Sequence, residues 1–237
     1  MSLICVSLME KTASDVFASA DKCKSLGADI IEVRFDGLAA QTESNLGEMS
    51  KLKENISLPV ILTIRPTWEG GKFEGDEENR ISLLKKAVES GFDYVDLELK
   101  MDIENLNFLV QMARDMGVKA IVSYHDFENT PSEKDILEKI IECQNAHADI
   151  AKVACYNKTF DEAYRVLRAG LAAKKLDIPY SVMGMGPFGH ITRILAPFAG
   201  CEFMYAALDH EIKVDEAQVP ISILKELWSL FDSTQTR

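Results

Sequence analysis

Three features are missing from this sequence of 237 residues: a long apolar run, paired cysteines and an excess of basic residues. No apolar run approaches the roughly 20 residues of a transmembrane helix. The N-terminal segment Met1-Ser2-Leu3-Ile4-Cys5-Val6 lacks the basic region of a signal peptide. The five cysteines are odd in number, widely spaced and without a Cys-x-x-Cys pair. Such cysteines are typical of reduced thiols, so the sequence predicts a cytoplasmic protein without a membrane partner.

Basic residues are outnumbered by acidic ones. The sequence has 26 Lys and Arg against 38 Asp and Glu, a net charge of -12. A chain this acidic repels nucleic acids and anionic membranes, which bind to basic patches, so neither is expected as a partner. We interpret the charge as that of a soluble outer surface. An anionic substrate would then require a few arginines that reverse the field locally.

Motifs for metals and nucleotides are missing as well. The four histidines lack the spacing of metal ligands, such as His-x-x-x-His, so no metal site is expected. There is no P-loop, no Gly-x-Ser-x-Gly nucleophile elbow and no basic–aromatic motif for nucleic acid.

Short β-branched runs alternate with amphipathic segments along the whole chain. The runs are almost continuously apolar, as expected for parallel strands that are covered on both faces. They occupy residues 3–8, 29–35, 59–65, 94–99, 119–126, 149–156, 179–185 and 201–207. The segments between them carry apolar residues at three- and four-residue spacing, which is typical of helices. These occupy residues 13–26, 44–54, 77–90, 104–115, 132–145, 159–173, 188–199 and 219–231.

The segments form eight strand–helix units and leave few residues over. Eight units of about 30 residues fill about 240 residues, which favours an α/β fold of the (β/α)8 TIM-barrel type. A doubly wound open sheet is the alternative, although it rarely uses eight units. No linker rich in Pro, Gly or Ser divides the chain, so residues 1–237 are predicted to form a single domain. In such a barrel the active site lies at the C-terminal ends of the strands.

Charged residues occur inside two predicted strands. Glu32 and Arg34 are two positions apart in the second strand and therefore point to the same face. Asp96 and Glu98 repeat this spacing in the fourth strand. Because buried charges are costly unless they are paired, a structural ion pair across the barrel and a functional site are both open interpretations.

Further polar residues lie where predicted strands end. Arg65 ends the third strand, Glu69 follows in the next loop, and His125 is near the end of the fifth strand. A single histidine is more often a satisfied core residue than a catalyst. Its place at a barrel strand end, beside carboxylates, favours catalysis.

Lys152 lies within the sixth predicted strand, in Asp149-Ile150-Ala151-Lys152-Val153-Ala154. Burial disfavours the charged form of a lysine. A neutral amine is the nucleophile that attacks carbonyl groups to form a Schiff base. The alternative is a lysine whose stem packs in the wall while its ammonium group reaches the rim.

A glycine-rich segment, Gly184-Met185-Gly186-Pro187-Phe188-Gly189, follows the seventh predicted strand. It reads as Gly-x-Gly-x-x-Gly, with Asp209 about 20 residues later, as in dinucleotide sites. That motif belongs to the opening turn of a doubly wound fold, whereas here it falls in the seventh unit. It also fits a phosphate site of a barrel, or a bend that lets Arg193 reach an anion in bidentate geometry.

The order of these residues resembles the type I 3-dehydroquinate dehydratase family. The opening Val6-Ser7-Leu8-Met9 and the late Ala217-Gln218 match as well, so the resemblance covers nearly the whole chain. The central motifs that carry it are Glu32-x-Arg34-x-Asp36, Thr63-Ile64-Arg65, Glu69-Gly70-Gly71, Ser123-Tyr124-His125-Asp126-Phe127, Lys152-Val153-Ala154 and Met183-Gly184 to Arg193.

The resemblance implies dehydration of 3-dehydroquinate to 3-dehydroshikimate in the shikimate pathway, without a metal or cofactor. Lys152 matches the lysine that forms a Schiff base with the substrate ketone. His125 matches the histidine that takes a proton beside the imine, donates one to the leaving hydroxyl, and assists imine formation and hydrolysis. Glu69 matches a carboxylate that orients and tunes this histidine.

The resemblance also implies substrate-binding roles. Arg193 matches the arginine that pairs with the substrate carboxylate, and Gln218 matches the glutamine of the loop that closes over the site. Residues matching the hydroxyl-binding and charge-network positions of the family, together with a small polar residue of the first strand, are Glu32, Arg34, Arg65 and Ser7.

The loop after the last strand departs from the family pattern. The family often has Ser-Ala-Pro-Gly-Gln where this chain has Val214-Asp215-Glu216-Ala217-Gln218. The serine contact is missing, and extra acids face an anionic substrate, so closure of the loop and substrate affinity are expected to differ. Thr192 before Arg193 replaces a common serine.

Two other functions fit parts of the pattern. A class I aldolase would share Lys152 and use the glycines near the seventh strand for a phosphorylated sugar. A sensor of a shikimate-pathway metabolite would bind without turnover. The family is commonly dimeric, so a homodimer is expected; the last helix, with Trp228 and Phe231, is a candidate interface, although Trp228 also fits packing of that helix against the barrel.

Overall fold

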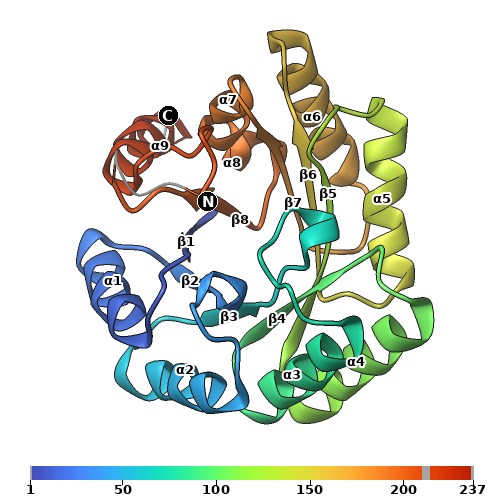
Figure 1. Ribbon diagram of the computed structural model, residues 1–237. Helices are drawn as coiled ribbons and strands as arrows, with labels where there is room; N and C mark the ends of the chain where they lie inside the picture. The colour runs from blue at the N-terminus through green and yellow to red at the C-terminus, as the bar shows by residue number, and fades with distance from the viewer. Residues whose placement is uncertain (1, 210–213, 236–237) are drawn as a thin grey trace.

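The computed structural model describes residues 2–209 and 214–235, with the side chains up to Phe231, and arranges eight parallel strands around a common centre (Figure 1). The strands are β1 (Leu3–Leu8), β2 (Ile30–Arg34), β3 (Val60–Thr63), β4 (Tyr94–Glu98), β5 (Lys119–Asp126), β6 (Ile150–Tyr156), β7 (Tyr180–Met185) and β8 (Phe203–Ala206). The predicted strands are thus confirmed to within two residues at each end.

Helices follow the strands and surround them on the outside. They are α1 (Ala13–Leu26), α2 (Glu43–Asn55), α3 (Glu77–Glu89), α4 (Ile103–Met116), α5 (Glu133–Asn145), α6 (Phe160–Ala173), α7 (Gly189–Ile194), α8 (Ala196–Ala199) and α9 (Ile221–Gln235). Two short 3-10 helices lie in loops at the C-terminal side of β2 and β3: η1 (Phe35–Gly37) and η2 (Thr67–Glu69). No helix in the described ranges is both long and apolar enough to span a membrane.

The sheet runs in the order β7-β6-β5-β4-β3-β2-β1-β8, so each strand but the last adds beside its predecessor. Between β7 and β8, the backbone N–H of Glu202 donates a hydrogen bond to the Tyr180 carbonyl oxygen at 2.7 Å. The Ser181 hydroxyl donates to the Phe203 carbonyl at 2.7 Å and accepts from the Phe203 N–H at 3.3 Å. A side chain therefore extends the bonding between these two strands, and the predicted (β/α)8 TIM barrel is confirmed.

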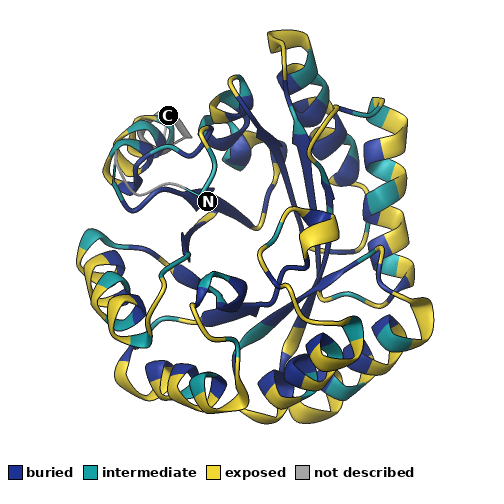
Figure 2. Ribbon diagram, in the orientation of Figure 1, coloured by how far each residue is buried: buried dark blue, intermediate teal, exposed yellow. Residues whose placement is uncertain are grey.

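Both faces of the sheet are buried, which is why the strands read as continuous apolar runs. In Figure 2 the strands are dark blue, whereas the helices are dark blue toward the barrel and yellow toward solvent. Helix starts follow local chemistry: Ser132 and Asp135 form a reciprocal capping box at the start of α5. The core therefore lies between the strands and helices, and polar side chains collect at one end of the barrel.

The helix predicted over residues 188–199 is wrong as a single element, because it breaks at Leu195 into α7 and α8. Pro197 has no N–H and is tolerated in the first turn of a helix, not in its interior. The chain therefore starts a new helix just before it. Trp228 is 3% exposed and donates its indole N–H to the Ile194 carbonyl at 3.0 Å, so it packs α9 against this region.

Candidate active site

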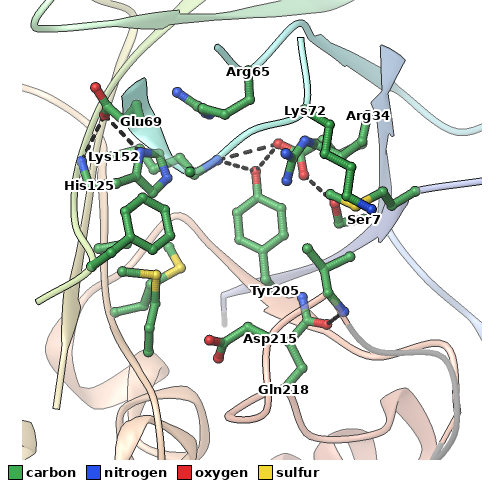
Figure 3. A pocket seen from close by; sticks show the side chains of 18 of the residues that line it. Ser7, Arg34, Arg65, Glu69, Lys72, His125, Lys152, Tyr205, Asp215 and Gln218 are labelled. Carbon is green, nitrogen blue, oxygen red and sulfur yellow. Dashed lines mark hydrogen bonds and ion pairs between the residues drawn. The ribbon is translucent and has the colours of Figure 1, made fainter. Parts of the chain in front are cut away.

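A cavity of about 360 Å³ opens at the C-terminal ends of the strands (Figure 3). This is within the usual size of a small-molecule site. The structure brings all nine predicted site residues together around it: Ser7, Glu32, Arg34, Arg65, Glu69, His125, Lys152, Arg193 and Gln218. Side chains from strands and loops across the whole barrel therefore converge on one space.

Lys152 comes from β6 and is 4% exposed. Its Nζ donates to Asp96 Oδ2 at 2.9 Å, to the Tyr205 hydroxyl oxygen at 2.9 Å and to Glu32 Oε1 at 3.3 Å. The lysine is therefore buried as predicted, but it is not isolated among apolar groups. Each of the three N–H bonds of its ammonium group has a protein acceptor.

Glu32 lies at the centre of the polar floor. Its Oε1 accepts from Thr63 at 2.9 Å and from Tyr205 at 3.0 Å, and its Oε2 accepts from the Ser7 hydroxyl. Although burial opposes ionisation, Lys152 and then other charges lower the pKa of Glu32. The carboxylate is thus held ionised beside the lysine by opposite charge and by hydrogen bonds.

Arg65 lines the cavity and joins it to buried carboxylates of β4. Its guanidinium donates to Asp96 Oδ1 at 2.7 Å, to Glu98 Oε1 at 2.8 Å and to the Ser123 hydroxyl at 2.8 Å. Burial disfavours the charge of Arg65, but Asp96 and Glu98 raise its pKa above the ordinary value. The two carboxylates of β4, Asp96 and Glu98, which are two positions apart and face the same way, therefore belong to an ion-pair network inside the barrel.

Arg34 does not pair with Glu32, its neighbour on the strand. It binds Asp36 in two-point geometry, through Nε at 2.9 Å and Nη2 at 2.7 Å. Asp36 Oδ2, which accepts from Arg34 Nη2, also accepts a hydrogen bond from the Lys72 backbone N–H at 3.0 Å. Arg34 therefore pairs locally with a residue of η1 and still lines the cavity, whereas the ion pair across the barrel joins Glu32 to Lys152.

His125 and Glu69 form a buried pair. Glu69 Oε1 lies 3.0 Å from His125 Nδ1 and also accepts the His125 backbone N–H at 2.9 Å. Burial, with Arg65 and Lys152 adding to it, lowers the pKa of His125 well below its ordinary value. Burial raises the pKa of Glu69 to about 7, against the opposing charge of Arg65. The imidazole is therefore neutral at neutral pH, and with its proton on Nδ1, facing Glu69, its Nε2 carries a free lone pair.

Arg193 is held by the glycine-rich segment. Its Nη1 donates to the carbonyl oxygens of Gly184 and Gly189, the second at 3.2 Å, while its Nε has no hydrogen-bond partner. A Cβ at Gly184 would overlap Asn157 Oδ1, and one at Gly189 would overlap the Gly184 carbonyl. Of the three interpretations of this segment, the structure supports the bend that positions Arg193.

The loop after β8 contributes Asp215 and Gln218 to the cavity wall. Asp215 Oδ1 lies 3.3 Å from Arg193 Nη2, and Gln218 Oε1 accepts the Val214 backbone N–H at 2.8 Å. Burial lowers the pKa of Arg193 to about 10, and Asp215 opposes this shift. The unusual acid of this loop thus pairs with the arginine expected to bind an anion.

Sequence reasoning missed two residues that line the cavity, Tyr205 and Lys72. Tyr205 occupies the same face of β8 as Phe203, and the period of two could have marked it as inward-facing. Lys72 follows Gly70-Gly71 in an exposed loop, and no periodicity identifies such a residue. Within the described part of the chain, no group of three or more His, Cys, Asp or Glu side chains is arranged to hold a metal ion.

Comparison with known proteins gives a single answer. A model of the family described as type I 3-dehydroquinase matches residues 4–235. The 3-dehydroquinate dehydratase of Methanocaldococcus jannaschii is 34% identical over 97% of this chain and 99% of its own length.

Solved structures agree. The crystal structure of 3-dehydroquinate dehydratase from Geobacillus kaustophilus superposes with a TM-score of 0.92 at 27% identity, covering 98% of this chain and 92% of that one. The type I 3-dehydroquinate dehydratase of Clostridium difficile, solved with covalently modified comenic acid, gives a TM-score of 0.92 at 26% identity, covering 98% and 93%.

Proposed function

The chain belongs to the type I 3-dehydroquinase family, and we propose that it dehydrates 3-dehydroquinate to 3-dehydroshikimate through a Schiff base on Lys152. The reaction is a step of the shikimate pathway. The observation that carries the proposal is the position of Lys152, whose amine lies on the floor of a cavity that His125 and Arg193 also line. A carbonyl substrate in this cavity would meet a nucleophile, a base and an anion-binding group together.

The imine explains how the adjacent carbon loses its proton. A protonated imine withdraws electrons, so the carbanion formed beside it is delocalised onto nitrogen. His125 is the base that removes this proton and then protonates the departing hydroxyl group. Its lowered pKa supports the first role, because the imidazole is uncharged and has a free lone pair when substrate binds.

Glu69 acts by holding the imidazole. Its Oε1 contacts both the ring Nδ1 and the backbone N–H of His125, which fixes the ring relative to the strand. This contact directs Nε2 toward the substrate and stabilises the imidazolium form once the proton has been taken.

The substrate is held by groups at two sides of the cavity. Arg193 binds the carboxylate of 3-dehydroquinate, a role supported by its burial and by its unpartnered Nε. The residues proposed to bind the hydroxyl groups and to set the local charge are Ser7, Glu32, Arg34, Arg65 and Gln218. Two members of this set, Arg34 and Arg65, supply positive charge at the cavity together with Arg193, in a chain whose net charge is -12.

The aldolase alternative depends on a phosphate site in the glycine-rich segment, and the bonding there argues against it. The Gly184 N–H donates to the Thr192 hydroxyl at 2.9 Å, and the Gly189 N–H donates to the Gly186 carbonyl at 3.0 Å. These amides are therefore occupied within the protein. A sensor without turnover would not require the neutral base that His125 supplies next to Lys152.

One experiment tests the substrate and the nucleophile together. Sodium borohydride is added with 3-dehydroquinate, and peptide mass spectrometry is expected to find the reduced adduct on Lys152. Ultraviolet absorbance of the conjugated enone product follows turnover. Lys152→Ala is expected to lose both signals, whereas Lys134→Ala, whose side chain is 83% exposed on α5, keeps them. Normal turnover by Lys152→Ala would refute the Schiff-base mechanism.

We also propose that the protein is cytoplasmic and forms a homodimer. All five cysteines are free and buried, which is compatible with a reducing compartment. The homodimer is proposed because members of the family are commonly dimeric. Trp228, one of the two aromatic residues expected at the interface, is buried within the protein and is therefore not available for that contact. Light scattering of the purified protein tests the assembly.

A further inference from the structure

Tyr205 places a hydroxyl group between the two charged residues on the cavity floor. Its oxygen accepts from Lys152 Nζ at 2.9 Å, and its proton points to Glu32 Oε1 at 3.0 Å. Figure 3 shows the Tyr205 ring standing in the cavity with this hydroxyl directed at the tip of Lys152. The three groups form a continuous path of hydrogen bonds from the ammonium group to the carboxylate.

The three acceptors of the Lys152 ammonium group are not equivalent. Asp96 is fully buried, and its second oxygen is bound by Arg65 and by Ser123 at 2.6 Å. Tyr205 and Glu32, by contrast, both line the cavity. A substrate carbon that bonds to Nζ must therefore come from the side of Tyr205 and Glu32, while the N–H toward Asp96 stays in place.

We propose that Tyr205 is a further catalytic residue, which carries a proton from Lys152 to Glu32 as the Schiff base forms. The inference rests on the Schiff-base function proposed above. The Tyr205 oxygen takes a proton from Nζ while its own proton passes to Glu32 Oε1. This leaves a lone pair on the cavity side of the nitrogen, available to the ketone carbon of a bound substrate.

The protons balance without an external acid. The ammonium group starts with three protons, and the protonated imine keeps the one that faces Asp96. The N–C bond forms as the π bond of the carbonyl opens to give a carbinolamine. The C–O bond breaks when the nitrogen lone pair forms the C=N bond, and the oxygen leaves as water with the other two protons. They move one at a time. The first passes through Tyr205 to Glu32, which gives it to the carbonyl oxygen and is ionised again. The second, on the N–H that faces Glu32, then passes to Glu32 and on to the departing hydroxyl group.

The electrostatics of Tyr205 fit a relay and not a phenolate base. Burial, with Glu32 and Cys5 adding to it, raises the pKa of Tyr205 well above its ordinary value. The hydroxyl therefore keeps one proton throughout and can release it only as it gains another. Paired donor and acceptor contacts on the same oxygen are the geometry that such an exchange needs.

The test removes only the hydroxyl. Tyr205→Phe keeps the ring, whose centroid lies 4.5 Å from Lys152 Nζ. The rate of borohydride-trapped adduct formation with 3-dehydroquinate is measured by rapid quench between about pH 6 and pH 10. At neutral pH we expect the rate to fall about 10- to 100-fold, in the lower range of general acid–base effects. The deficit should shrink as pH rises, because hydroxide then removes the lysine proton.

Tyr180→Phe is the matched control. Tyr180 is 4% exposed on β7, and its single hydroxyl proton is shared between two carbonyl oxygens on the outer side of the strand, Ala199 at 2.8 Å and Gly170 at 2.9 Å. Its trapping rate and pH profile are expected to match those of the unaltered enzyme. A Tyr205→Phe profile equal to this control, or a loss that is the same at every pH, would overturn the relay.

Two further results separate the possible failures. If the unaltered enzyme forms no adduct with 3-dehydroquinate, the Schiff-base function itself is wrong. If Tyr205→Phe does not fold, Glu32→Gln interrupts the other end of the path, and its trapping rate should also recover at high pH. A pH-independent loss in Glu32→Gln would then refute the proton path.

Discussion

Asp215 and Arg193 meet in the wall of the cavity, with Oδ1 of the aspartate 3.3 Å from Nη2 of the arginine. Asp215 also accepts the Ala217 backbone N–H at 2.9 Å, so the carboxylate is tied to its own loop. A substrate carboxylate must compete with this internal carboxylate for the same guanidinium. The loop that departs from the family pattern therefore contacts the residue proposed to bind the substrate carboxylate.

Asp215→Asn is expected to lower KM for 3-dehydroquinate. The amide keeps an oxygen for the Ala217 N–H but removes the charge that competes for Arg193. Loss of about 1 kcal/mol of competing ion pairing corresponds to a KM about threefold to tenfold lower, with kcat little changed. Steady-state kinetics at low ionic strength measure this. Glu216→Gln makes the same charge change one residue away on an exposed side chain, and an equal decrease in KM there would attribute the effect to net loop charge alone.

Glu69→Gln is expected to change how stability depends on pH. The pKa of Glu69 is raised from 4.5 to about 7, mainly by burial, so the folded state holds the proton more tightly than the unfolded state. Stability from this group is present below pH 4.5 and is lost as pH rises through about 7. Glutamine removes this loss while keeping an oxygen for His125.

The relative stability of Glu69→Gln and the unaltered protein should therefore shift by about 3 kcal/mol in favour of glutamine between pH 4.5 and pH 8. Urea unfolding at both pH values gives the two differences. Glu138→Gln, on a side chain that is 50% exposed, should show no such shift. Activity of Glu69→Gln should fall about 10- to 100-fold, because the imidazole loses its charged partner.

Lys152→Ala is expected to destabilise the fold as well as abolish activity. Removal of a catalytic residue often stabilises an enzyme, because active sites are strained. Here the ammonium group neutralises Asp96 and Glu32, both buried. Leaving these carboxylates without it should lower the free energy of unfolding by about 3 to 5 kcal/mol. Lys134→Ala on the surface should change the free energy of unfolding by no more than about 0.5 kcal/mol. If Lys152→Ala is as stable as that control, the ion pairs of Lys152 with Asp96 and Glu32 contribute nothing to stability.

Much of the fold could be predicted because its signal is local. Parallel strands buried on both faces are apolar along their length, and the strand predicted over residues 119–126 matches β5 at both ends. Helix starts depend on neighbours such as Ser132 and Asp135, which a sequence displays directly. The break at Leu195 was missed because apolar periodicity continues through it, and only Pro197 marked the restart.

The site was partly predictable for a different reason. A charge in an apolar strand is unusual, so Glu32 and Lys152 were conspicuous without knowledge of their neighbours. Their partners were not, because the contacts join strands far apart in sequence: Lys152 meets Tyr205 across 53 positions and Glu32 across 120. Periodicity gives the face on which a side chain lies, but it does not give the side chain that it meets across the barrel.

Gly184→Ala tests whether the glycine-rich segment exists to position Arg193. An added Cβ would overlap Asn157 Oδ1 and press on Gly189 Cα, so the backbone that carries the Gly184 carbonyl must move. That carbonyl is bound by Arg193 Nη1, and its displacement moves the guanidinium. We expect KM for 3-dehydroquinate to rise at least about tenfold, and the free energy of unfolding to fall by about 1 to 3 kcal/mol, as for overpacking.

Gly47→Ala is the control for Gly184→Ala. Gly47 lies in α2, and an added Cβ would meet no described atom within 4 Å beyond its chain neighbours and the nearby backbone of its own helix. Alanine there should therefore stabilise the helix by about 0.5 to 1 kcal/mol and leave KM unchanged. If the segment instead formed a phosphate site, inorganic phosphate would compete with substrate, and Gly184→Ala would weaken that competition. Two results together would contradict the proposed role of the segment: an unchanged KM in Gly184→Ala, and competition by phosphate in the unaltered enzyme. They would show that these glycines form a phosphate site and do not position Arg193.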